Sequence, residues 1–93
     1  MASSAARRYT QAIAELAEED NTYDAWQRDL ETLNGVVSDA EVLAWLQNPA
    51  VNDADKISAV EAVLGGAQPE TRNLVRMLIQ RRRLELVPDI NAL

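Results

Sequence analysis

Residues 68–87 read QPETRNLVRMLIQRRRLELV, and this stretch decides the fold. Pro69 and Glu70 are typical of a first helical turn, because proline is preset for helical φ and an acid favours the positive end of the helix dipole. Apolar residues then recur at spacings of three and four and predict one buried face, made of Leu74, Val75, Leu78 and Ile79. We expect a helix over residues 69–82.

This expected helix also carries apolar and basic residues beyond its buried face. Met77 lies off the apolar stripe, and arginines occupy other turn positions and the end of the helix: Arg72, Arg76, Arg81, Arg82 and Arg83. A helix with apolar surface on more than one side contacts more than one neighbour. We therefore predict that one side packs in the core and that another side offers a docking surface.

The composition is that of one globular domain built from helices. The 93 residues are 47% hydrophobic and 26% charged, with two tryptophans, two tyrosines and no phenylalanine. Alanine and leucine must therefore form the core, which suits closely packed helices, and no segment alternates apolar and polar residues long enough for a strand. We predict an all-α fold, a compact bundle of five or six helices in a single domain spanning residues 1–93.

Cap and stop signals give the other expected helices. The first covers residues 5–18 after a Ser3 or Ser4 cap, and the second runs from an Asn21 or Thr22 cap to either Gly35 or Val37. The remaining three are a helix capped by the Ser38–Glu41 capping box and stopped at Pro49, one from Asn52 to a C-terminal cap at Gly65 and Gly66, and a short one opened by Pro88.

The first helix is rich in alanine and has a clear stripe. Tyr9, Ala12, Ile13 and Leu16 form this stripe. Small side chains favour helix and also let another helix approach closely. Two interpretations stay open: an ordinary core helix, or one wall of a groove that binds a partner helix.

Charge and residue usage exclude several classes of function. A formal net charge of −6 argues against nucleic acid as the main partner, because binding phosphates needs a basic surface. Histidine and cysteine are both absent, which removes the usual zinc ligands, thiol nucleophiles and histidine bases, and no glycine-rich phosphate loop follows a strand. We expect a non-enzymatic protein without catalytic residues, cofactor or metal site. No apolar run approaches the length of a membrane span, so we expect a soluble, cytoplasmic protein.

Three motifs resemble one known family. The opening RRYTQAIAELA, residues 7–17, resembles the A-R-x-Y-A-x-A-L-F-x-L-A pattern of the delta subunit of rotary ATP synthases, whose mitochondrial counterpart is the oligomycin-sensitivity-conferral protein. Gln47-Asn48-Pro49 resembles its L-x-N-P element, and residues 73–88 resemble its N-F-L-x-x-L-x-x-x-x-R-L-x-x-L-P block. The departures are Thr10 for alanine, Ile13-Ala14 for Leu-Phe, and Arg82 where glycine is common.

The resemblance implies a six-helix N-terminal domain with a structural role. In this family, the domain lies on the catalytic head and joins it to the peripheral stalk at the cytoplasmic face of the membrane. It binds the N-terminal amphipathic helix of an alpha subunit in a groove between its first and fifth helices. We expect the family's second domain, which contacts the b-type stalk subunits, to be missing from this chain, and we expect neither nucleic-acid binding nor direct membrane insertion.

Positions matching the family's groove give the predicted partner-helix site. They are Arg8, Tyr9, Ala12, Ile13 and Leu16 from the first helix, and Asn73, Arg76, Met77 and Gln80 from the fifth. Arg8 and Arg76 are expected to pair with acids on the bound helix, while Ile13 and Leu16 fit the core equally well. The alternative function is a generic helical protein- or RNA-binding module that uses Arg81, Arg82 and Arg83.

Overall fold

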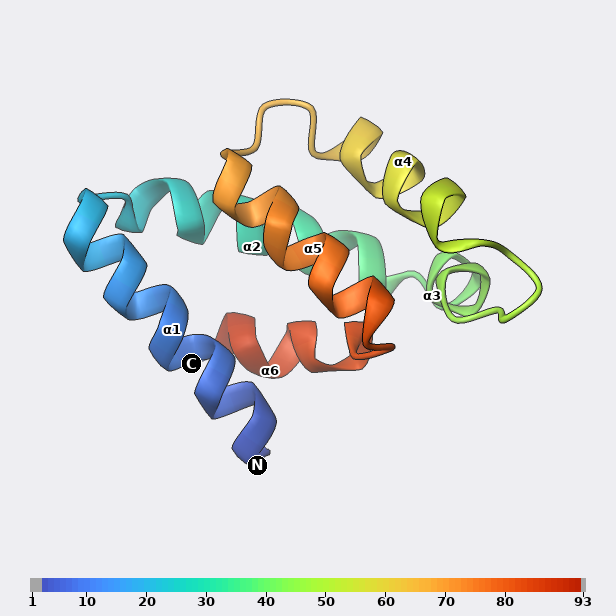
Figure 1. The fold of residues 1–93 in the computed structure, drawn as a ribbon, viewed down its shortest axis with the longest axis horizontal. Helices are drawn as coiled ribbons and strands as arrows, with labels where there is room; N and C mark the ends of the chain where they lie inside the picture. Colours follow the sequence, from blue (N-terminus) through green and yellow to red (C-terminus); the bar gives the residue numbers. More distant parts are fainter. Residues whose placement is uncertain (1–2, 93) are drawn as a thin grey trace.

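The computed structural model describes residues 3–92, and six α-helices and one 3-10 turn account for most of these residues (Figure 1). Their bounds are α1 Ser4–Asp20, α2 Tyr23–Ser38, α3 Ala40–Leu46, α4 Asp53–Val63, α5 Pro69–Gln80, the 3-10 turn η1 Leu84–Leu86, and α6 Val87–Ala92. Residues 3–92 contain no strand. The prediction of an all-α bundle is confirmed. Within the same residues, no helix is long and apolar enough to cross a membrane.

Two helices at the centre of the bundle hold the others in place. The helix α2 packs against α1, α3, α5 and α6, and α6 packs mainly against α2 and α1. The helix α5 packs chiefly against α4. Figure 1 shows α1 in blue and α5 in orange on either side, with α6 in red running between their lower ends. The helices α1 and α5 thus both pack against α2, and neither packs closely against the other.

The buried face predicted for α5 is confirmed. Leu74, Val75, Leu78 and Ile79 are all buried, while Met77 beside them keeps 36% of its surface exposed. The spacing of three and four residues explains this division, because it turns one stripe of the helix inward and leaves the adjacent stripe outside.

The boundary between α2 and α3 differs from the sequence-based prediction, which left Gly35 and Val37 open as the end of the second helix. The helix α2 continues through Gly35, and Ser38 still belongs to it, with the Ser38 hydroxyl donating to the Asn34 carbonyl at 2.7 Å. The cap of α3 is therefore Asp39, whose Oδ1 accepts from the N–H groups of Glu41 and Val42 at 2.9 and 3.2 Å. The predicted capping box with Ser38 as its first residue is wrong by one position.

The glycine cap predicted for α4 is also wrong. The helix ends at Val63 with Leu64 as its C-terminal cap, and neither Gly65 nor Gly66 adopts a positive φ. These two glycines lie in the turn that leads to α5 and do not provide the left-handed residue of a glycine cap.

The left-handed cap instead occurs at the end of α5, at an arginine. The helix stops at Gln80, two residues before the predicted end, and Arg82 has φ 57°. The Arg82 N–H donates to the Ile79 carbonyl at 3.1 Å, and the Arg83 N–H donates to the Leu78 carbonyl at 2.8 Å. These two bonds form a Schellman motif, whose left-handed position glycine usually occupies. The resemblance implies glycine at this position, and the left-handed φ suits that residue.

A buried carboxylate joins α2 to the start of α5. Asp29 is 3% exposed, and its Oδ2 accepts from the Thr71 hydroxyl at 2.8 Å and from the Gln68 N–H at 3.1 Å. Gln68 is the N-cap residue of α5, and Thr71 lies in the first turn of that helix. Asp29 thereby fixes where α5 begins relative to α2.

Replacing Arg82 with glycine should stabilise the protein. A side chain in the left-handed region costs about 1–2 kcal/mol, part of which is offset by the backbone entropy that glycine loses on folding. We expect Arg82→Gly to raise the free energy of unfolding by about 0.5–1 kcal/mol in urea denaturation. The control Arg83→Gly, at φ −122°, should not raise it. A lower free energy of unfolding in Arg82→Gly would show that the left-handed conformation of Arg82 is not strained.

Removing the Asp29 carboxylate should destabilise the bundle. In Asp29→Ala the Thr71 hydroxyl and the Gln68 N–H lose their buried acceptor, at a cost of about 1–3 kcal/mol. The matched control is Glu31→Ala, an exposed acid on the same helix, which should change stability by about 0.5 kcal/mol or less. Thermal and urea denaturation followed by circular dichroism measure both variants. Equal effects of the two substitutions would refute the structural role of Asp29.

Candidate functional site

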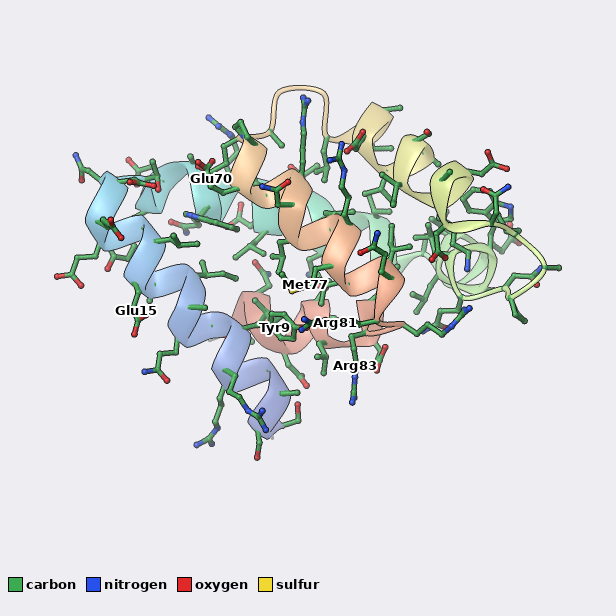
Figure 2. All side chains as sticks on the ribbon, in the orientation of Figure 1. Tyr9, Glu15, Glu70, Met77, Arg81 and Arg83 are labelled. Carbon is green, nitrogen blue, oxygen red and sulfur yellow. The ribbon has the colours of Figure 1, made fainter. Side chains whose placement is uncertain are left out.

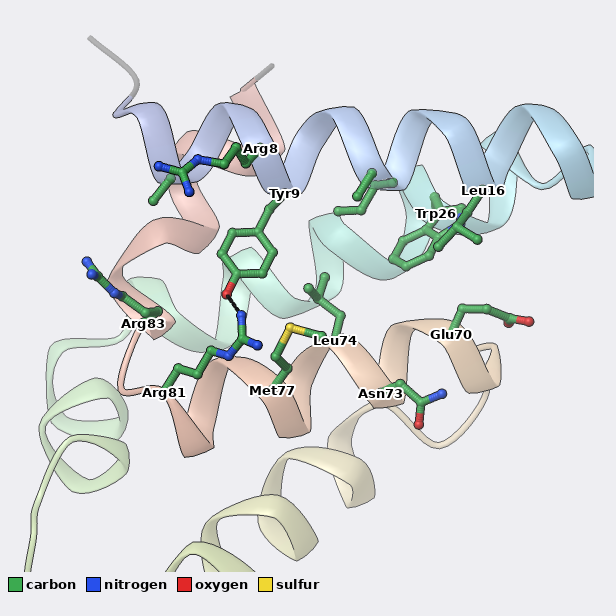
Figure 3. Close-up of a pocket in the computed structure, with 13 residues that line it drawn as sticks. Arg8, Tyr9, Leu16, Trp26, Glu70, Asn73, Leu74, Met77, Arg81 and Arg83 are labelled. Carbon is green, nitrogen blue, oxygen red and sulfur yellow. Dashed lines mark hydrogen bonds between the residues drawn. The ribbon is translucent and has the colours of Figure 1, made fainter.

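An open groove lies between α1 and α5. Its volume is about 680 Å³, and Figure 3 shows the two helices facing each other across it. The residues that line it come mainly from α1 and α5, with Trp26 added from α2 and Arg83 from the segment after α5: Ala5, Arg8, Tyr9, Ala12, Ile13, Leu16, Trp26, Glu70, Asn73, Leu74, Met77, Arg81 and Arg83.

The α1 wall follows the stripe that the sequence predicted. Tyr9 is half-buried, Ala12 is exposed, and Leu16 keeps 40% of its surface exposed. Ile13 is buried in the core and also lines the groove. Ala12 therefore leaves open space at the middle of the wall, while Ile13 serves both the core and the groove.

The α5 wall is made of residues at positions 70, 73, 74, 77 and 81, which follow the helical spacing of three and four. Asn73 and Met77 are exposed, and Leu74 is 6% exposed. The helical periodicity predicted Leu74 on the buried face, apart from the docking surface. The structure corrects this, because Leu74 packs in the core and also lines the groove.

Seven of the nine predicted site residues line the groove, and Arg76 and Gln80 do not. Arg76 is turned toward α4, where its Nη2 lies 2.8 Å from Oε1 of Glu61 and its Nε donates to the same oxygen at 3.0 Å. Gln80 is exposed and follows Arg76 by one helical turn. The stripe of α5 that faces α1 therefore runs through Asn73 and Met77 to Arg81.

Tyr9 and Arg81 connect the two walls at one end of the groove. Nη1 of Arg81 donates to the Tyr9 hydroxyl at 3.3 Å, drawn as the dashed line in Figure 3. Arg8 and Arg83 line the same end, whereas Leu16, Trp26 and Glu70 line the other. Trp26 is buried there, and its Nε1 has no hydrogen-bond partner within residues 3–92.

The predicted site lacked several residues that line the groove, among them Arg81 and Arg83. The spacing of four residues from Met77 gives Arg81 directly, so the helical pattern contained that signal. Arg83 could not be predicted in this way, because the chain leaves the helix at the left-handed Arg82.

The three consecutive arginines do not form one surface. Arg81 and Arg83 line the groove, while Arg82 lines a separate cavity of about 160 Å³ together with Lys56, which is 2% exposed. Proteins that bind single-stranded nucleic acid use a continuous, positively charged groove. These three arginines do not form such a groove, because they lie at different cavities.

The groove is largely apolar. Its walls offer alanine, isoleucine, leucine and methionine side chains, with polar groups at the ends. Among residues 3–92, no group of three or more acidic, histidine or cysteine side chains is arranged to hold a metal ion.

Comparison with known proteins identifies the family. A family model described as the ATP synthase delta (OSCP) subunit matches residues 5–93. The chain belongs to this family. It is 43% identical over 87 residues to an ATP synthase subunit delta of Dehalococcoides mccartyi, covering 94% of this chain and 48% of that protein. It is 35% identical over 92 residues to the chloroplastic ATP synthase delta chain of Pisum sativum, covering 97% of this chain and 37% of that protein.

Membership of the delta (OSCP) family confirms the resemblance seen in the sequence motifs. The chain spans about half the length of the bacterial delta subunit that it matches. The match covers all six helices and therefore both walls of the groove.

Proposed function

We propose that this chain is a structural, non-catalytic part of the ATP synthase peripheral stalk, and that its α1–α5 groove binds the N-terminal amphipathic helix of an alpha subunit. This contact would help hold the catalytic head to the stator against the torque of the rotor. One observation carries the proposal: a member of the delta (OSCP) family has an open apolar groove between its first and fifth helices.

The exposed apolar side chains of the groove support helix capture. Leu16 and Met77 expose 40% and 36% of their surfaces on opposite walls. A guest helix that covers them removes apolar surface from water, which stabilises the complex by about 25 cal/mol per Å². Amphipathic helices bind such grooves through apolar side chains three and four residues apart.

Three side chains fit the groove to a helix. Ala12 leaves room for the close approach of a second backbone, because its side chain is a single methyl group. Met77 is unbranched and adapts its shape to the guest. Tyr9 adds aromatic area with a polar end. We propose these residues as the centre of the contact, with Ile13, Leu16 and Asn73 beside them and Arg8 at one end.

The wider assembly belongs to the same proposal. We propose that the protein acts at the cytoplasmic face of the membrane as a peripheral part of the complex. Attachment to b-type stalk subunits, which the family resemblance assigns to a second domain, is proposed for the whole protein and not for residues 1–93.

Placing a charge at the centre of the α1 wall should abolish binding without unfolding the bundle. Ala12 is exposed in mid-helix, so Ala12→Asp should keep the helical content near that of the native protein. A desolvated carboxylate facing the apolar guest should weaken binding by about a hundredfold or more. Calorimetric titration with a peptide of the first twenty or so residues of a cognate alpha subunit measures the effect.

The matched control is Ala59→Asp, an exposed mid-helix alanine on α4 that does not line the groove. It should bind the peptide as the native chain does. Loss of helical content in Ala12→Asp alone would assign Ala12 to the core, and equal binding by both variants would remove the groove from the proposal.

A further inference from the structure

The two ends of the groove carry opposite charges. Arg8, Arg81 and Arg83 line one end, while the acid on the lining, Glu70, lies at the other end. Figure 2 shows Tyr9, Arg81 and Arg83 near the last turn of α5 and Glu70 near its first turn. Eleven residues separate Glu70 from Arg81, which is about 16 Å along a helix axis, or three turns of a guest helix.

The antiparallel course of α1 and α5 produces this arrangement. The hydrogen bond from Arg81 to Tyr9 places the last turn of α5 beside the beginning of α1. Leu16, two turns further along α1, lies at the end where α5 begins (Figure 3). Arg8 and Arg83 therefore lie together at the Tyr9 end although they are 75 positions apart in the sequence.

The cations at the Tyr9 end are available to a ligand. Within residues 3–92, neither Arg8 nor Arg83 takes part in an ion pair, and the one side-chain bond of Arg81 goes to the neutral Tyr9 hydroxyl. All three side chains are exposed. Arg76, by contrast, already pairs with Glu61 outside the groove.

A bound helix has a direction that these charges can recognise. Its C-terminus carries about half a negative elementary charge and its N-terminus about half a positive one. Apolar walls of low polarisability strengthen the interaction of such charges with the ends of a groove. Three arginines at one end and a glutamate at the other favour one direction of the guest and oppose the reverse.

We propose that the groove binds its guest helix in a single direction, with an acidic C-terminal end beside Arg8, Arg81 and Arg83 and a neutral or basic N-terminal end beside Glu70. This inference rests on the proposed capture of a helix and adds its polarity. The occupant is thus an amphipathic helix of about three turns with acids clustered in its C-terminal part. The apolar walls supply most of the affinity, and the charged ends determine the direction.

Two synthetic peptides of about 18 residues, long enough to cover the groove, test the charge preference. They share the same leucine, alanine and methionine positions, but one has lysines in its first turn and glutamates in its last. The other has lysines in both turns, so that neither direction places an acid beside the arginines. We expect the first peptide to bind about tenfold more tightly at about 0.1 M salt, and the preference to shrink at about 1 M salt.

The two peptides differ in their own helix content, which also affects their affinities. Two arginine variants of the protein control for this difference. Arg83→Gln should reduce the ratio of the two dissociation constants by about threefold. Arg7→Gln loses the same charge from an exposed α1 residue that does not line the groove, and should leave the ratio unchanged. Because each ratio compares the same two peptides, differences in their helix content cancel. Equal ratios in the native chain and Arg83→Gln would contradict the proposal.

A nitroxide on either end of the first peptide reports its direction. A C-terminal label should broaden the amide resonances of Arg8 and Arg83, and an N-terminal label those of Leu16 and Glu70. The opposite pattern, or equal broadening at both ends from each label, would overturn the single direction while leaving helix capture intact. If neither peptide perturbed the groove at any salt concentration, helix capture would fail together with its direction.

Discussion

Burial of one face of α5 is the constraint on which the groove depends. Val75 and Leu78 are fully buried, so α5 cannot rotate about its axis without exposing them or burying its arginines. With that face fixed, Asn73 and Met77 must lie on the flank that faces α1. The carboxylate of Asp29 adds a fixed starting point by binding Gln68 and Thr71. The packing of α5 in the core therefore determines which of its side chains line the groove.

The groove also needs α1 and α5 to stay apart, and the packing of other helices provides this. The helix α1 is held by α2 and α6, while α5 is held mainly by α4. For this reason α5 does not pack onto the alanine-rich face of α1, and Ala12 remains exposed. The bond between Tyr9 and Arg81 spans the remaining gap at one end. Apolar side chains left uncovered in this way mark a surface suited to a partner.

Local patterns in the sequence predicted the helices and the buried face of α5, because these follow from a period of 3.6 residues. The groove between the first and fifth helices was implied by the resemblance to the delta-subunit family. Two local details were wrong, the first residue of the α3 cap and the glycine cap of α4. The other features that the sequence did not reveal depend mostly on contacts between distant residues. The pairing of Arg76 with Glu61 and the burial of Asp29 and Lys56 arise only when separate helices meet. The exit from α5 depends on Arg82 adopting a left-handed conformation that its residue type does not favour. Arg83 reaches the groove for that reason, and periodicity alone could not reveal it.

The central claim is that the α1–α5 groove captures an apolar helix. Calorimetry with a peptide of the first twenty or so residues of a cognate alpha subunit, at about 0.1 M and about 1 M salt, tests it most directly. We expect one-to-one binding with a negative heat-capacity change, because apolar surface is buried, and an affinity that largely survives high salt. Absence of binding, or binding that disappears at high salt as expected for a purely electrostatic contact, would contradict it.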